Sequence, residues 1–146
     1  MGFLLFVVPL FMPKKNNWPT LLAHFIEDRK AVPFEWGKND CCLFVADAIE
    51  HITGNDYAAE YRGTYTTELG AYRSLKKRGD GTVASAWAAH FPEIPVNAMG
   101  RGDVALVLVK EEPAVSICFG ARLWIVSKQG LITLPRSEAV KAWRVA

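Results

Sequence analysis

The fold is decided by residues 36–54, which read WGKNDCCLFVADAIEHITG. Asn39 or Asp40 can accept a hydrogen bond from the first turn of a helix, and apolar residues then recur at helical spacing. Gly54 follows the last turn, where a residue with a left-handed backbone commonly ends a helix. The stretch therefore predicts a helix that begins at Cys41.

A helix that begins with a cysteine has a chemical consequence. The unpaired N–H groups and the dipole at a helix N-terminus stabilise a thiolate and so lower the pKa of the thiol. Cys41 is therefore the candidate catalytic nucleophile, whereas Cys42 and Cys118 are interpreted as small buried apolar residues. Because Cys41 and Cys42 are adjacent and the total of three cysteines is odd, we expect a chain without disulfides.

Residues that bind metals do not cluster in the sequence. The three histidines, His24, His51 and His90, stand at intervals unlike those of zinc sites, and no C-x-x-C motif occurs. We expect no metal site and no cofactor.

The composition is that of one ordinary domain. The chain has 146 residues, of which 51% are hydrophobic, with 17 Lys or Arg against 15 Asp or Glu and a net charge of +2. A domain of this length can build a core without disulfides or a structural metal. A charge so near zero argues against a nucleic-acid partner, because such binding depends on neutralising phosphates.

The first twelve residues are unusually apolar, and no charge occurs before Lys14. The run is too short to span a membrane as a helix, and Pro9 would interrupt it, so no transmembrane segment is expected. A signal peptide is not favoured, because no A-x-A cleavage site follows. We interpret residues 1–15 as a segment separate from the domain at 16–146, either a mis-annotated start before Met12 or a segment that docks onto a partner chain through Phe3, Leu4, Leu5, Phe6 and Phe11.

The rest of the first two thirds also has helical patterns. One helix is expected from Thr20 to Lys30 and a short one over residues 83–90. Another starts at Thr66 or Thr67, and its apolar residues are expected to face inward: Leu69, Tyr72 and Leu75.

The last third is rich in predicted strands. A helical piece over 137–142 and an edge strand over 143–145 are expected to close the chain. Connections of hairpin length, typical of an antiparallel sheet, join four earlier strands at residues 104–109, 115–119, 123–126 and 131–134. The sequence predicts an α+β fold, with N-terminal helices packed on a C-terminal antiparallel sheet of about five strands.

Three short stretches resemble the NlpC-type cell-wall peptidases, a compact papain-like family. Residues 40–45 (DCCLFV) resemble the D-C-S-G-F-V helix start of those enzymes and place Cys41 on their nucleophile. Residues 101–107 (RGDVALV) are similar to their P-G-D-L-V-F-F strand, and residues 114–120 (AVSICFG) to their H-V-G-I-Y-L-G strand. The resemblance implies a papain-like fold over roughly residues 36–134, and it puts Ala114 where the enzymes have their catalytic histidine.

A second resemblance covers nearly the whole chain. It rests on W-G-x-x-D-C-C-L-F-x-A-D from Trp36 to Asp47, and on three further blocks: YRGTY at 61–65, RGDV at 101–104 and AWRV at 142–145. This set resembles a family of small uncharacterised proteins carried with tail genes in phages and prophages. It implies a virion protein of the phage tail tip, made in the bacterial cytoplasm, with other tail proteins as partners and peptidoglycan as a further candidate.

Three functions from different classes follow from these observations. The favoured one is a structural component of the tail tip, with a degenerate peptidase fold. The second is a cysteine peptidase or amidase that cuts peptidoglycan through Cys41 with an unidentified base. The third is a module that binds a cell-wall peptide in the cleft beside Cys41, with Asp40, Trp36 and Arg62 as candidate binding residues. For Arg62 and Asp47 we favour a structural salt link or a solvated face.

Overall fold

A computed structural model describes residues 13–145 of the chain, so the proposed docking residues Phe3, Leu4, Leu5, Phe6 and Phe11 lie outside the described part. Four α-helices come first along the chain: α1 (Trp18–Arg29), α2 (Cys41–Thr53), α3 (Glu68–Arg78) and α4 (Val83–Ala88). Six strands follow: β1 (Glu93–Ile94), β2 (Val104–Val109), β3 (Glu112–Phe119), β4 (Arg122–Ser127), β5 (Gly130–Pro135) and β6 (Lys141–Trp143).

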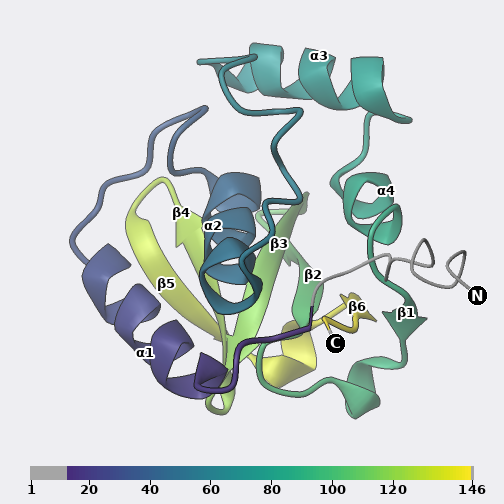
Figure 1. Ribbon diagram of the computed structural model, residues 1–146. Helices are drawn as coiled ribbons and strands as arrows, with labels where there is room; N and C mark the ends of the chain where they lie inside the picture. Colours follow the sequence, from purple (N-terminus) through teal and green to yellow (C-terminus); the bar gives the residue numbers. More distant parts are fainter. Residues whose placement is uncertain (1–12, 146) are drawn as a thin grey trace, which may run out of the picture.

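The strands form one antiparallel sheet in the order β1-β6-β2-β3-β4-β5. The α1 and α2 helices lie against one face of this sheet, with α2 beside β3 (Figure 1). The predicted α+β class and antiparallel sheet are therefore confirmed. None of the helices within residues 13–145 is long and apolar enough to cross a membrane.

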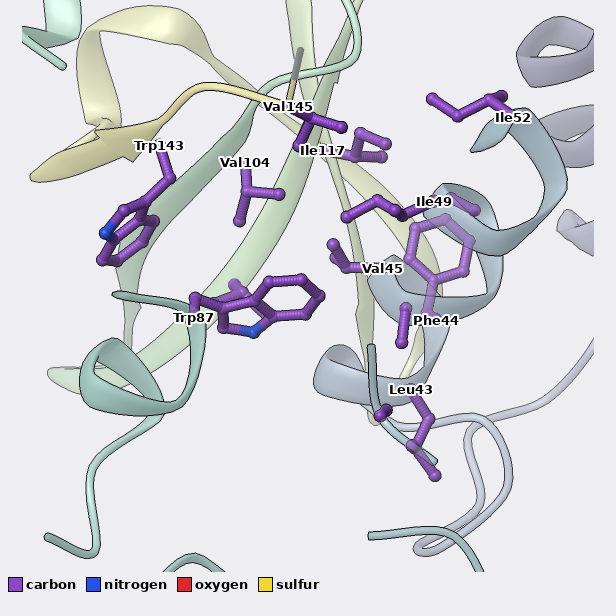
Figure 2. Close-up of a cluster of buried hydrophobic side chains, with 14 of the residues drawn as sticks. Leu43, Phe44, Val45, Ile49, Ile52, Trp87, Val104, Ile117, Trp143 and Val145 are labelled. Atoms are coloured by element: carbon purple, nitrogen blue, oxygen red, sulfur yellow. The ribbon is translucent and has the colours of Figure 1, made fainter. Parts of the chain in front are cut away.

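The central helix α2 begins and ends as its sequence predicts. Asp40 is the N-cap, and its carboxylate accepts a hydrogen bond of 3.0 Å from the Leu43 N–H. Gly54 ends the helix in the left-handed region with φ of 86°. Figure 2 shows Val45 and Ile49 of α2 directed toward the sheet, in a core cluster that includes Ile117 and Val145.

The sheet is covered on both faces near its middle. Residues 104–107 of β2 are all buried, as the continuous apolar run predicted. Val104 and Leu106 belong to the core shared with α2. The alternate residues Ala105 and Val107 pack in a second cluster that contains Met99, Ala142 and Cys118.

The C-terminal end of the chain differs from the sequence prediction. Residues 137–142 do not form a helix: a single 3₁₀ turn covers Arg136–Glu138, and β6 begins at Lys141. The strand β6 is also not an edge, because Trp143 lies opposite both Glu93 of β1 and Val104 of β2. The sheet has six strands rather than about five, because β1 pairs with β6. The pattern of β1 is only two residues long and is too short to predict a strand.

Two helix boundaries also differ from the sequence prediction. The first helix starts at Trp18 with Asn17 as its N-cap, two residues before Thr20, because Pro19 fits the first turn of a helix. The α4 helix ends at Ala88 rather than at His90.

The α3 helix has a different environment from the one predicted. Thr67 caps it as expected, accepting a hydrogen bond of 3.0 Å from the Gly70 N–H. However, α3 stands away from the sheet (Figure 1), and Leu69 and Tyr72 are 58% and 55% exposed. The inward packing predicted for Leu69 is wrong, because Leu69 lies outside the cavity beneath α3. Tyr72 and Leu75 do line that cavity, and the open space leaves Tyr72 exposed.

A buried carboxylate joins two of the sequence motifs. Asp103 is 2% exposed, accepts hydrogen bonds from the backbone N–H groups of Gly100 (2.9 Å) and Val145 (3.0 Å), and pairs with Arg144 at 3.2 Å. Gly102 has φ of 83°, and a Cβ there would approach the Trp18 ring to 3.0 Å. The RGDV and AWRV motifs therefore contact each other, and their residues stabilise the fold.

Candidate functional site

The site begins at the loop that leads into α2. One oxygen of the Asp40 carboxylate caps the helix, and the other accepts hydrogen bonds from the Gly37 N–H (3.0 Å) and the Tyr65 hydroxyl (2.6 Å). The carbonyl oxygen of Tyr65 lies where a Cβ on Gly37 would come within 2.1 Å, so only glycine fits there. Asp40, predicted as a binding residue, is 2% exposed and holds the loop to the helix start.

Cys41 is the first residue of α2 and is half-buried. The pKa of its thiol is lowered, chiefly because the Cys42 side chain hydrogen-bonds to the Cys41 sulfur, with the Val115 N–H as a further donor. Burial and the Asp40 carboxylate act in the opposite direction. The pKa of Cys42 is raised by the adjacent Cys41 and by burial, so Cys42 keeps its proton and acts as the donor of the pair.

Two cavities meet at Cys41. The first, of about 190 Å³, lies under α3 and is lined by residues of α2, α3, α4 and the loop 57–65. The second, of about 310 Å³, lies between the start of α2 and strands β3 and β4. Four residues line both cavities: Trp36, Cys41, Glu68 and Pro113. The predicted binding residue Trp36 therefore lies at the site, with its ring edge-on to Phe34 at 4.9 Å between centroids.

Ala114 lies beside Cys41 in the second cavity and packs in the same apolar cluster. A methyl group thus occupies the position that the sequence resemblance assigned to a histidine. His24 is exposed on α1, and His51 packs its ring against Phe25 at 5.8 Å between centroids. Neither is among the residues that line the two cavities.

His90 is a cavity residue that the sequence prediction missed. It lines the first cavity, with its ring 5.1 Å from that of Tyr57. Burial lowers the pKa of His90, so its imidazole is neutral over a wider pH range than a solvent-exposed histidine. A sequence signal existed, because His90 follows the buried Trp87 by three residues and so shares its side of the helical turn.

Arg62 belongs to a salt-bridge network behind the site. Its guanidinium pairs with Asp47 at 2.6 Å and with Asp56 at 2.8 Å, and Asp47 also pairs with Arg29 at 2.7 Å. These bonds raise the pKa of Arg62 and lower that of Asp56. The structural salt link favoured for Arg62 and Asp47 is confirmed, and it ties α1, α2 and the loop 56–65 together.

Fold and site together define an α+β protein that presents a thiol at a helix N-terminus between two cavities. Within residues 13–145, no group of three or more His, Cys, Asp or Glu side chains could hold a metal ion. The chain belongs to the family described as "Domain of unknown function (DUF6950)", which it matches over residues 13–145. No curated protein matches the chain.

Proposed function

We propose that the protein is a papain-like domain of the NlpC type that does not hydrolyse peptides and serves as a structural component of a phage tail tip. One observation carries the proposal: the methyl group of Ala114 lines the same cavity as the Cys41 thiol, at the place where a thiol peptidase needs its base. The rest of the arrangement, a cysteine at the start of α2 beside a β2–β3 hairpin, supports the papain-like assignment.

Peptide hydrolysis by a thiol needs a group that moves protons. The base takes a proton from the thiol and returns it to the departing amine, and such transfer contributes roughly 10²–10⁴-fold to the rate. An alanine side chain cannot do this. The pKa of Cys41 is already lowered by Cys42 and Val115, so the thiolate can form, but position 114 gives the departing amine no proton donor.

The structural role is supported by what the motif residues do. Gly37, Asp40, Arg62 and Asp103 carry the resemblance to phage proteins, and all four hold parts of the fold together. The exposed Leu69 and Tyr72 give apolar surface for contact with neighbouring tail proteins, and the apolar sequence of residues 1–12 suits the same role.

Two measurements test this proposal. Purified protein incubated with muropeptides should release no new fragments, and mass spectrometry of purified tails of the phage that carries the gene should detect the protein. Cleavage that disappears in Cys41→Ala would contradict the loss of hydrolysis. A complete tail that lacks the protein would contradict the structural role.

A second function is favoured by the lowered pKa of Cys41. In that alternative the protein is a cysteine peptidase or amidase of the cell wall, with Cys41 as nucleophile and a base other than residue 114. The cavities also suit a module that binds a cell-wall peptide. Calorimetry with stem peptides separates this from the scaffold, since binding without cleavage would support the module.

A further inference from the structure

The two cavities at Cys41 have different chemical character. The first is lined mainly by aromatic rings and small apolar groups, among them Tyr61, Trp87 and Ala86, with Glu68 and His90 also at its wall. The second is lined by apolar residues such as Ile125 and Val126 and by a larger share of polar and charged groups, including Lys110, Lys128 and Gln129. A molecule that reacts with Cys41 can therefore place an apolar arm in one cavity and a polar arm in the other.

The missing base restricts which bonds Cys41 can break. An amide needs a proton on its nitrogen before the amine can leave, and Ala114 cannot supply one. A thioester has no such need, because a thiol with a pKa near 8.5 leaves as a stable thiolate. Both the attacking and the departing sulfur then carry the negative charge in turn, and no proton has to move during the exchange.

From the two cavities and the alanine at position 114, we propose that Cys41 accepts a small apolar acyl group from a thioester. The Cys41 thiolate attacks the thioester carbonyl, a new sulfur–carbon bond forms to Cys41, and the sulfur–carbon bond of the donor breaks. The electron pair leaves with the donor sulfur as a thiolate, which takes its proton from water. The acyl group lies in the aromatic cavity under α3, and the departing thiol lies in the polar cavity.

Several groups on the protein favour this reaction. The Cys42 side chain and the Val115 N–H stabilise the attacking thiolate. Because the Asp40 carboxylate already accepts the Leu43 N–H, the donors that remain in the first turn of α2 for the developing negative charge are the N–H groups of Cys41 and Cys42. With Ala114 in place of a base, position 114 supplies no group that activates water against the new thioester, which favours a long-lived acyl group on Cys41.

The size of the first cavity selects the acyl group. An apolar cavity of about 150 Å³ is known to hold a benzene molecule. At about 190 Å³, the cavity under α3 has room for a phenylacetyl group. The substrate class is thus thioesters of short or aromatic apolar acids.

This inference rests on the proposed absence of hydrolysis, and the experiment separates the two. The full-length protein is incubated at pH 7.5 with the phenylacetyl thioester of N-acetylcysteamine, and intact mass and peptide mapping locate the adduct. We expect one acyl group per chain, on Cys41, removable by hydroxylamine. In a parallel sample, muropeptide cleavage together with a Cys41 adduct would overturn the proposed function alone, whereas absence of both cleavage and adduct would overturn this inference alone.

Two matched pairs of variants sharpen the test. Cys41→Ser should abolish the adduct. Cys118→Ala should not, because Cys118 lies in the core on the other face of the sheet. If Cys41→Ser fails to fold, peptide mapping of the unaltered chain still shows which residue carries the acyl group. Ala86→Leu fills the first cavity, while Ala88→Leu lies on the exposed side of the same helix. We expect Ala86→Leu to slow phenylacetyl transfer at least about tenfold, the scale of a methylene-sized change in an apolar pocket.

The acetyl thioester of the same thiol is the control for cavity size. Acetyl transfer should be unaffected by Ala86→Leu, because the acetyl group does not reach into the cavity, and Ala88→Leu should change neither rate. Equal slowing of both donors by Ala86→Leu, or labelling of Cys42 or Cys118 at the rate of Cys41, would overturn the proposal.

Discussion

The α2 and α3 helices have similar sequence signals and opposite environments. Each has a side-chain N-cap, Asp40 for α2 and Thr67 for α3. Eight of the thirteen residues of α2 are buried, whereas Ser74 alone is buried in α3. The difference teaches that a cap and an apolar pattern specify that a helix forms, while the rest of the fold decides what its apolar face touches.

The largest effect should come from a matched pair of leucines. Leu43 near the start of α2 is 1% exposed, and Leu69 near the start of α3 is 58% exposed. We expect Leu43→Ala to lower the free energy of unfolding by about 2–5 kcal/mol, because it leaves a cavity in the core. Leu69→Ala should change it by less than about 0.5 kcal/mol. Urea denaturation measures both, and similar values for the two would refute the contrast.

The helix caps should differ by a smaller amount. Asp40 accepts three hydrogen bonds in a buried place, and Thr67 accepts one at the surface. Asp40→Ala is therefore expected to cost about 2 kcal/mol and Thr67→Ala about 0.5 kcal/mol, the two ends of the usual range for N-caps. Thermal unfolding followed by circular dichroism gives both numbers. A larger loss for Thr67→Ala would show that α3 is anchored more firmly than its exposure indicates.

The smallest effect concerns thiol reactivity at the start of α2. The Cys42 side chain is the main cause of the lowered pKa of Cys41, so Cys42→Ala should raise that pKa. Each unit of increase cuts the thiolate fraction near pH 7 about tenfold, and alkylation by iodoacetamide slows in proportion. Cys118→Ala is the control, because burial raises the pKa of Cys118 and keeps it out of the reaction. If the alkylation rate of Cys41 is unchanged in Cys42→Ala, Cys42 is not the cause of the lowered pKa of Cys41.

The parts of the fold that could be predicted are those specified locally. The start of α2 at Cys41, its end at Gly54 and the run in β2 depend on neighbours in the sequence. The place of α3, the strand β1 and the interior position of β6 could not be predicted, because each depends on which distant segment lies alongside. A two-residue strand such as Glu93–Ile94 exists only because β6 pairs with it.

The candidate site could also be predicted only where neighbouring residues in the sequence specify it. Cys41 follows from the helix start, and the salt link of Arg62 with Asp47 follows from opposite charges in two motifs. The two cavities could not be foreseen, since they form where α3, α4 and the β3–β4 strands approach one residue. His90 enters the site because the turn that follows α4 borders the first cavity.

The position of β6 has a consequence for how the protein is made. Of the six strands, this one is synthesised last, yet it lies between β1 and β2 and supplies the pairing that joins β1 to the sheet. Strand β1 is synthesised some fifty residues before it can be paired, roughly three to ten seconds earlier at common translation rates. Until the segment after β6 has also emerged, Asp103 lacks Arg144 and the Val145 N–H. Completion of this fold therefore waits for β6, and nascent chains stalled before β6 emerges should be protease-sensitive.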